Sequence, residues 1–215
     1  PQMIRFEYEK NGSCLMTKMA ACLNEYENSL QQETERIQCE NKLALLIHII
    51  ANTLTGQSFM LVQVNHNHNQ VDSSLARSVF TLLTRVQLQK SSGFRCHVHL
   101  ELAFLEFFLL FRRTFINDQK SLAILREYDD CQESTPPARA LAFRDFFEKV
   151  GFKNHVEVLR VIWNKISDNL QNWSDHEGII AASLRVLRDL TSGYEYSRLL
   201  LSLEEVQYLL EHLSV

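Results

Sequence analysis

The sequence predicts an all-α fold, an α-solenoid of HEAT-like antiparallel helical hairpins, and three observations support this prediction. Only six glycines and three prolines interrupt the 215 residues, which favours long helices over many short strands. Apolar residues recur at helical spacing along most of the chain, so each helix has one face to bury. Helices are expected to begin near Arg36, Arg95 and Asn154, roughly 59 residues apart, whereas a HEAT hairpin takes ~40–47 residues. Irregular connections expected at residues 57–71 and 117–137 account for the excess.

Four helices are expected in the first half of the chain. They cover residues 13–30, residues 33–55, a segment capped by Asp72 or Ser73, and residues 95–115. Their apolar stripes are, in chain order, Leu15, Met19, Leu23, Tyr26 and Leu30; Leu43, Leu46, Ile47 and Ile50; Leu75, Val79, Leu82, Leu83 and Val86; and Leu100, Phe104, Phe107, Phe108 and Phe111. The fourth helix is apolar around most of its circumference, so we expect it to be buried on two sides. The polar run Asn65–Asn69 is expected to lie in an exposed connection.

The middle of the chain is expected to be less regular. Residues 117–128 predict a short helix, and residues 129–135 predict a charged loop. Pro136 and Pro137 are expected to open the next helix, because proline suits a first helical turn, and Gly151 follows its end. The apolar residues of this helix are Leu141, Phe143, Phe146, Phe147 and Val150.

Residues 154–212 carry the clearest helix signals. A serine or asparagine three residues before a glutamate predicts a helix N-terminus with reciprocal capping. The three such pairs are Asn154 with Glu157, Ser174 with Glu177, and Ser202 with Glu205. The predicted apolar stripes are Val158, Val161, Ile162, Ile166 and Leu170 for the first helix, and Ile180, Leu184 and Leu187 for the second. Gly193 is expected to end the second helix in a left-handed conformation, before helices at 196–201 and 203–212.

These helices group into three predicted hairpin units. The units cover approximately residues 13–92, 93–152 and 153–215, and together form one segment of a HEAT-repeat superhelix. Because the chain begins with Pro1 instead of methionine, we expect it to be a fragment of a longer chain. No signal peptide opens it.

Composition excludes several classes of protein. The net charge of −4 and the pI of about 6.1 give no electrostatic footprint of a nucleic-acid or membrane-surface binder. The five cysteines are odd in number and form no C-x-x-C pair, which favours a reducing compartment over a disulfide framework. The longest apolar run, around Phe104–Phe111, is far shorter than the ~20 residues of a membrane span.

Two acidic strings raise one enzymatic alternative. Asp129–Glu133 form a D-D-x-x-E string, and Asn117, Asp118 and Ser121 begin an N-D-x-x-S string. In an all-helical protein such oxygen ligands can hold Mg²⁺ against a diphosphate, as in terpene synthases. The second string ends at Leu125 instead of a carboxylate, and the order of the strings is reversed. A solvated acidic loop is therefore the favoured interpretation, and the chain is predicted not to be an enzyme.

Two histidine pairs and one tryptophan pair are candidate binding sites. His66 and His68 could bind a metal ion, but no cysteine or carboxylate lies near them in sequence. His97 and His99 are two positions apart, so a helix would direct them to nearly opposite faces, and Cys96 beside His97 would be splayed away. Trp163 and Trp173 are interpreted as packing residues between helices. The sequence therefore predicts no catalytic, metal-binding or cofactor-binding residues and no cofactor, and it leaves the partner-binding residues open.

Several motifs resemble the exportin-7 branch of the importin-β family, the karyopherin-β nuclear transport receptors. They are Ile166–Trp173, Ser183–Tyr194, Leu203–Leu210, Glu101–Ala103, Phe107–Phe108, Phe111–Arg112, Phe115–Gln119 and Ile47–Ile50 ahead of Gly56. The resemblance runs discontinuously from about residue 43 to 212. The exportin-4 branch shares the part of this signature at Asn169, Leu170, Trp173 and Ser174. Residues 57–70 and 129–138 fit neither pattern.

The resemblance implies a function in nuclear transport. Members of this family are HEAT-repeat solenoids, not enzymes, and carry cargo through nuclear pores under control of the GTPase Ran. It implies that the parent protein binds Ran in its GTP form, protein cargo and nucleoporins, and shuttles between nucleus and cytoplasm. A helical-repeat scaffold without Ran dependence is the alternative, and a compact helical bundle that binds a small ligand is a third interpretation.

Overall fold

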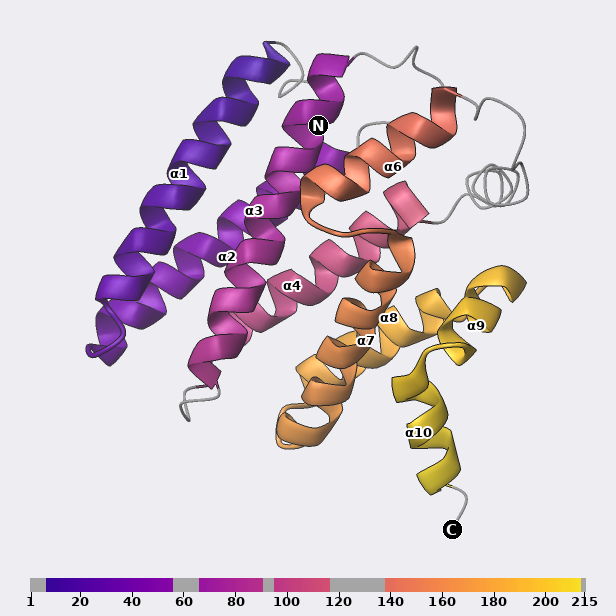
Figure 1. Cartoon of the computed structure of the whole chain (residues 1–215). Helices are drawn as coiled ribbons and strands as arrows, with labels where there is room; N and C mark the ends of the chain where they lie inside the picture. Colours follow the sequence, from indigo (N-terminus) through magenta and orange to yellow (C-terminus); the bar gives the residue numbers. More distant parts are fainter. Residues whose placement is uncertain (1–6, 56–65, 91–94, 117–137, 214–215) are drawn as a thin grey trace. The chain divides into compact units, whose positions relative to one another are not determined.

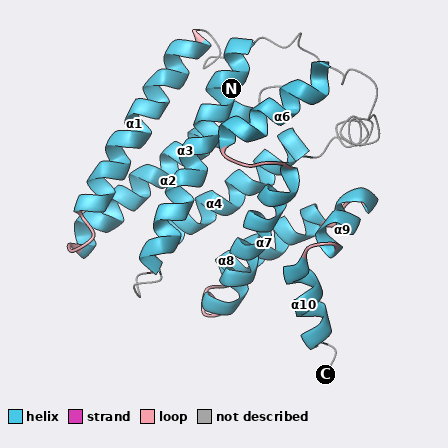
Figure 2. Ribbon diagram, in the orientation of Figure 1, coloured by secondary structure: helices cyan, strands magenta, loops and turns pink. Residues whose placement is uncertain are grey.

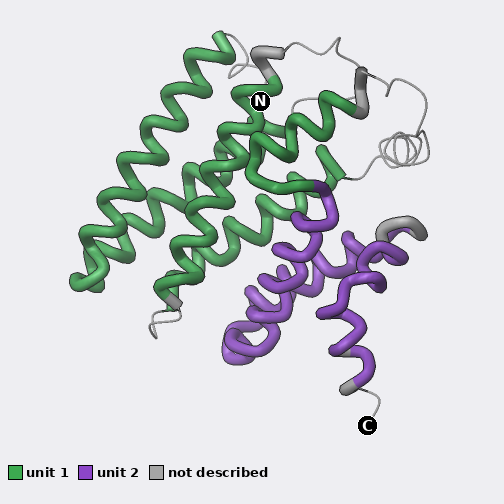
Figure 3. Tube along the Cα trace, viewed as in Figure 1, with its two compact units in different colours: residues 1–153 green, residues 154–215 purple. Residues whose placement is uncertain are grey.

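The computed structural model describes residues 7–55, 66–90, 95–116 and 138–213 of the chain. These residues form helices and short connections, with no strand among them (Figure 2). The prediction of an all-α solenoid is confirmed. The chain divides into two compact units, residues Pro1–Lys153 and Asn154–Val215 (Figure 3). The boundaries predicted for the three hairpin units stay a prediction.

Unit 1 stacks its helices in two layers (Figure 1). One layer holds α1 (Tyr8–Asn28), α3 (His66–Lys90) and α6 (Ala138–Val150). The other holds α2 (Glu33–Thr55) and α4 (Val98–Phe111), which the π-helical turn η2 (Arg112–Ile116) continues. α1 and α2 pack against each other as a hairpin, so each layer receives one helix of that pair.

Consecutive helices within a layer run parallel. Between α2 and α4, hydrogen-bonded contacts join Arg36 to Arg95, Glu40 to His97 and Asn41 to His99, at separations of 59, 57 and 58 positions. Between α1 and α3, Tyr8 bonds to Asp72 near one end, and Glu27 pairs with Arg85 at 3.7 Å near the other. The offset between α2 and α4 is nearly constant, which is the geometry of a stacked repeat. It matches the spacing of roughly 59 residues that the sequence predicts for helix starts.

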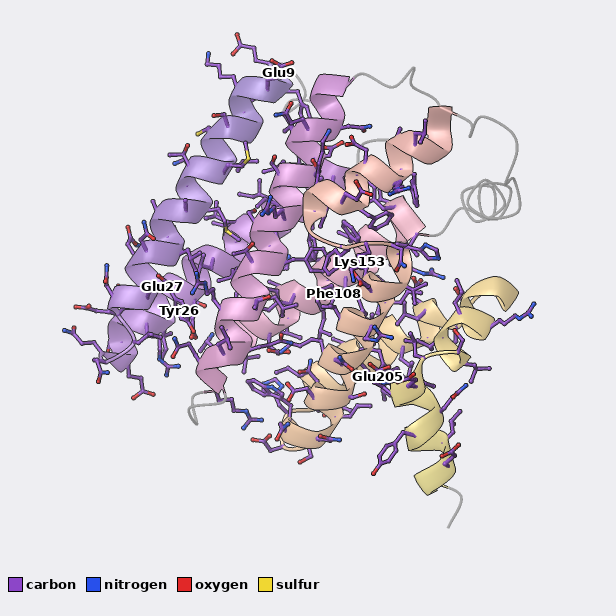
Figure 4. The ribbon with its side chains drawn as sticks, in the orientation of Figure 1. Glu9, Tyr26, Glu27, Phe108, Lys153 and Glu205 are labelled. Atoms are coloured by element: carbon purple, nitrogen blue, oxygen red, sulfur yellow. The ribbon has the colours of Figure 1, made fainter. Side chains whose placement is uncertain are left out.

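Phenylalanine side chains fill the space between the layers of unit 1. Phe107 and Phe111 of α4 lie edge-on to Phe80 of α3, with ring centroids 5.5 and 5.4 Å apart. Phe146 of α6 stacks on Phe115 of η2 at 4.4 Å. All five rings are buried, as is Phe108, which is labelled in Figure 4. The predicted burial of the fourth helix on two sides is confirmed.

Two helices of unit 1 begin earlier than predicted. α1 starts at Tyr8 instead of residue 13, because Tyr8 is buried and donates to the Asp72 carboxylate. α3 starts at His66, so the irregular connection predicted for 57–71 is wrong for its last six residues. The prediction that Asp72 or Ser73 caps this helix is wrong, because both are buried inside it. Tertiary contact with α1 overrides the polar composition here.

The remaining helices of unit 1 follow the prediction more closely. α2 has the predicted bounds, and its expected stripe is buried throughout. α4 begins at Val98, three residues after the predicted start, because His97 takes the N-cap position. On α6, Leu141 is exposed, unlike the other predicted stripe residues. Gly151 follows α6 with φ of 111°, a left-handed conformation that costs glycine little, and the Phe152 N–H bonds back to Phe147.

Unit 2 consists of α7 (His155–Asn172), α8 (Glu177–Leu190), α9 (Tyr194–Leu201) and α10 (Glu204–Leu213). α7 packs on α8 as the short turn between them predicts. Trp163 of α7 contacts a buried cluster from the last two helices. The members of this cluster are Leu200, Leu203 and Val206, with Val156 and Leu187 packed against it. Arg160 also pairs with Glu205 at 2.8 Å (Glu205 is labelled in Figure 4).

One of the three predicted N-cap residues is confirmed. The Asn154 side chain accepts from the Glu157 N–H at 3.1 Å and caps α7. Ser174 does not cap α8, because His176 occupies the N-cap position. Ser202 does not cap α10 but closes α9, donating its hydroxyl to the Leu199 carbonyl at 2.7 Å. Gly193 precedes α9 with φ of −165°, so the predicted left-handed end of α8 is wrong.

The buried face of α8 differs from the predicted stripe. Its buried residues are Ile179, Ser183, Val186 and Leu190. Ser183 accepts a hydrogen bond from Asn169 of α7 at 3.2 Å, and both side chains are fully buried. Leu184 is 48% exposed instead, and Leu170 at the end of the α7 stripe is also exposed. α8 thus buries the face that carries Ser183, which pairs across the hairpin, and not the predicted face of Ile180, Leu184 and Leu187.

Three predictions for the middle of the chain lie outside the described residues. They are the helix at 117–128, the charged loop at 129–135 and the helix opening at Pro136–Pro137. α6 begins at Ala138, directly after this last segment.

Candidate partner-binding face

A buried carboxylate joins α2 to the start of α4. Glu40 accepts from the His97 N–H at 2.6 Å, at the N-terminus of α4, where backbone donors lack helical partners. Arg36, one turn earlier, lies 3.6 Å from the other Glu40 oxygen and donates to the Arg95 carbonyl at 3.1 Å. This role is not predictable from the sequence, because an arginine and a glutamate four positions apart usually form a surface pair. The contacts fix the register of α4 on α2.

Burial and neighbouring charges shift the pKa values in this group. Burial raises the pKa of the Glu40 carboxyl, while the His97 N–H and Arg36 act in the opposite direction. Burial also lowers the pKa of His97, with His99 and Arg36 contributing. The Tyr26 hydroxyl of α1 (labelled in Figure 4) has a raised pKa because of burial and the nearby Glu40.

The outer side of the same two helices presents a continuous row of side chains. We name this row the α2–α4 face: Asn41, Leu45, His48, His99, Leu102 and Glu106. Asn41 contacts His99 at 2.9 Å, and His48 contacts Glu106 at 3.3 Å. Leu45 lies between the two α2 members of these pairs and is 61% exposed, although the other leucines of α2 are buried.

The chemistry of the α2–α4 face suits contact with another protein. An apolar centre with a polar, hydrogen-bonded rim is the usual anatomy of a protein interface. The rim groups bond to each other across the seam, so the face is held in one arrangement before any partner arrives. Nothing in this arrangement supplies a nucleophile with an adjacent base.

The histidine pair at the start of α4 has a different geometry from the one predicted. The rings of His97 and His99 lie 4.8 Å apart, edge to face, instead of on opposite helix faces. The prediction was wrong because His97 is the N-cap residue and has extended backbone, so helical spacing does not apply to it. Cys96 also precedes the helix, and its thiol donates to Glu101 at 3.3 Å.

The other candidate ligands do not form a described site. His66 and His68 lie in the first turn of α3, and their side chains are outside the described residues. Both acidic strings, at 117–125 and 129–133, also lie outside them. Within 7–55, 66–90, 95–116 and 138–213, no three His, Cys, Asp or Glu side chains are placed to hold a metal ion. No helix of this part is long and apolar enough to cross a membrane.

The tryptophan pair has the predicted packing role. Trp163 lies in the buried cluster of unit 2, and Trp173 is 4% exposed, with its ring edge-on to His176 at 6.1 Å. Both rings pack in the interior of unit 2.

Comparison with known proteins decides the family. A family model described as the TPR domain of exportin-7-like proteins matches residues 1–214. The chain belongs to the exportin-7-like family. The match covers more of the chain than the motifs at 43–212 on which the sequence resemblance rests, and it favours the exportin-7 branch. TPR and HEAT repeats both consist of stacked antiparallel helix pairs. The α1–α2 hairpin, from Tyr8 to Thr55, is longer than the roughly 34 residues of a TPR unit.

Individual relatives of this exportin-7-like chain are similar at low identity. Exportin-7-B of Xenopus laevis is 28% identical over 215 residues, which cover 97% of this chain and 18% of the relative. Ran-binding protein 16 of Drosophila melanogaster is 28% identical over 212 residues (97% and 17%), and human Ran-binding protein 17 is 24% identical over 213 residues (97% and 18%). The chain therefore spans less than a fifth of the length of these relatives. No solved structure matches it significantly.

Proposed function

We propose that the chain is a segment of a nuclear transport receptor that binds Ran in its GTP form and protein cargo. The observation that carries the proposal is the exportin-7-like match over residues 1–214, together with relatives named exportin and Ran-binding protein. The segment acts by binding partners and not by catalysis. Its parent protein shuttles between nucleus and cytoplasm and contacts nucleoporins on the way through the pore.

The stacked geometry of unit 1 supports a mechanical role. Each helix pair of a stack contacts only its neighbours, so small shifts spread over several of these contacts can give the stack more than one curvature. A ligand that prefers one curvature shifts the population towards it, and this shift changes the affinity for a second ligand. Ran-GTP and cargo are the two ligands of this proposal.

The α2–α4 face is the proposed contact for one of these partners. Leu45 supplies the apolar centre, and His48 with Glu106 supplies part of the rim. Replacing Leu45 by aspartate places a charge at the centre of the contact, where it would be buried without a partner.

The experiment is a pull-down of the full-length parent protein with Ran locked in its GTP or its GDP state. The transport proposal predicts recovery with Ran-GTP well above recovery with Ran-GDP. Equal recovery with both forms would contradict it. The Leu45→Asp variant, beside a Leu88→Asp control on the exposed side of α3, tests whether the α2–α4 face takes part.

A helical-repeat scaffold without Ran dependence remains the second candidate, because the surface features of unit 1 suit any protein partner equally. Nucleocytoplasmic shuttling of the parent protein separates the two. A scaffold would stay in one compartment when nuclear export is blocked, whereas a transport receptor would redistribute.

A further inference from the structure

Two cysteines lie at the same level of the α1–α2 hairpin. Cys22 is six positions before the last residue of α1, Asn28, and Cys39 is six positions after the first residue of α2, Glu33. The two helices pack against each other on either side of a short turn. In an antiparallel hairpin, residues at equal distances from the turn are level with each other, so these two cysteines are level.

An ion pair crosses the hairpin at the same level. Lys42 of α2 donates to Glu25 of α1 at 2.9 Å, and each of them lies three positions after one of the cysteines. Residues three positions apart share a helix face. Glu25 is three positions before the end of α1 and Lys42 is nine positions after the start of α2, so their mean level is that of the cysteines. Cys22 and Cys39 therefore lie on the sides of α1 and α2 that border one seam.

The separation of packed helices suits a disulfide bond at this seam. Helix axes ~8–10 Å apart, with Cα atoms ~2.3 Å from each axis, bring opposed Cα atoms close enough for the ~4.4–6.8 Å that a disulfide bond spans. Both thiols are free in the structure. This geometry belongs to the α1–α2 hairpin alone and does not depend on what packs against the hairpin in the parent protein.

The two thiols differ in their surroundings. Cys22 is half-buried, whereas Cys39 is only 6% exposed. Burial raises the pKa of the Cys22 thiol, and Glu25 and Cys39 act in the same direction while Lys42 opposes them. Cys39 is thus near enough to Cys22 for an electrostatic interaction. An oxidant from solvent reaches Cys22 first, and Cys39 is the neighbour that can react with the product.

We propose that Cys22 and Cys39 are a redox-sensitive pair, which hydrogen peroxide converts to a disulfide bond between α1 and α2. The Cys22 thiolate attacks one peroxide oxygen, the O–O bond breaks, and a sulfenic acid and one water form. The Cys39 sulfur then attacks the Cys22 sulfur, loses its proton and displaces hydroxide, so that the S–S bond and a second water form. The two thiols lose two electrons in total, and the peroxide gains them.

The bond would hold α1 on α2 at mid-hairpin. It closes a loop over residues 23–38, which restricts the unfolded chain and opposes local separation of the two helices. A small thiol reverses the step by thiol–disulfide exchange. The proposal does not depend on whether the parent protein binds Ran.

Peptide mapping of the full-length parent protein tests the pair. The protein is treated with hydrogen peroxide at mildly alkaline pH, its remaining thiols are alkylated, and it is digested without reduction. Mass spectrometry should detect a peptide that joins positions 22 and 39, with two hydrogen atoms fewer than its parts, and dithiothreitol should abolish it. Both thiols remaining free while the exposed Cys14 is oxidised would overturn the proposal.

Cys14 is the matched control on the same helix. It is fourteen positions before the end of α1, so it lies about 12 Å from the level of Cys39 and should not be joined to it. A peptide joining 14 to 39, or 39 to Cys96, in place of the 22–39 peptide would contradict the pairing. This map uses the unmodified protein, so it decides the proposal even where a cysteine variant fails to fold.

Hydrogen exchange gives the second readout. Oxidation should slow amide exchange in the middle of α1 in the unmodified protein and in Cys14→Ser, because local separation from α2 is opposed. The slowing should be lost in Cys22→Ser and in Cys39→Ser. Equal slowing in Cys22→Ser and the unmodified protein would show that the effect does not come from this bond and would overturn the proposal.

Discussion

Gly12 of α1 lies against Val71 of α3, so closely that a Cβ at position 12 would overlap the Val71 Cγ1 atom. Both positions are buried, and the contact lies one turn from the buried pairing of Tyr8 with Asp72. The absence of a side chain at position 12 therefore sets how closely the first two helices of this layer approach.

Replacing Gly12 by alanine is expected to destabilise unit 1. Alanine normally stabilises a helix interior relative to glycine, but here the added methyl group overlaps Val71. Overpacking of this kind lowers the free energy of unfolding by about 1–3 kcal/mol. Urea unfolding followed by circular dichroism measures the change.

Two comparisons identify the cause of that loss. Gly178→Ala places its Cβ 3.4 Å from the His176 ring, an ordinary contact, so stability should be unchanged or up to about 1 kcal/mol higher. In Gly12→Ala/Val71→Ala the loss should be smaller than the sum of the single losses. Strict additivity would show that the two helices do not meet at this point.

Glu40 should contribute to stability in a pH-dependent way. Its carboxyl pKa is raised in the folded state, so folding favours the protonated form, and the stability that Glu40 contributes falls as pH rises from the ordinary carboxyl range through the raised pKa. Glu40→Gln keeps an acceptor for the His97 N–H but removes this titration. The stability of the unmodified chain relative to Glu40→Gln should therefore increase as pH falls from 7 towards 5.

Glu40→Ala provides the contrast. It leaves the buried His97 N–H without its acceptor, which should cost about 1–3 kcal/mol at pH 7. Chemical unfolding of the three proteins across this pH range checks both statements. A difference between the unmodified chain and Glu40→Gln that stays constant with pH would show that the carboxyl is not buried as described.

Asn154 and Ser174 should respond differently to alanine. Asn154→Ala removes the side-chain acceptor that caps α7 and should cost about 0.5–2 kcal/mol. Ser174→Ala should change stability by less than about 0.5 kcal/mol, because Ser174 is exposed and His176 takes the N-cap position. Thermal unfolding of the two variants gives the comparison, and equal losses would restore Ser174 as a cap.

Hydrophobic period and helix length were predictable from the sequence. The bounds of α2 and the buried stripes of α2, α3 and α4 agree with the structure, because these helices bury long aliphatic and aromatic faces. The spacing of roughly 59 residues also appears as the offset between α2 and α4. Strong periodic signals of this kind do not depend on which helix supplies the opposite surface.

Polar residues buried by tertiary contact were not predictable. Ser183, Asp72 and Glu40 have the composition of caps or surface groups, yet each is buried because a side chain or backbone group of another helix bonds to it. The same limit applies to the α2–α4 face, since Leu45 belongs to a mostly apolar helix and only packing leaves it exposed. The residues next to each of these positions in the sequence do not indicate which distant helix packs against it.

The parallel stacking of α2 on α4 underlies both the fold of unit 1 and the proposed binding face, and a disulfide crosslink tests it most directly. Asn41 and His99 bond across this seam at 2.9 Å, so cysteines placed at both positions of the full-length parent should crosslink under mild oxidation. Mass spectrometry should detect the peptide that joins positions 41 and 99, and cysteines at positions 41 and 106, one of them two turns further along α4, should not crosslink. A crosslink between 41 and 106 without one between 41 and 99 would contradict the stacking described here.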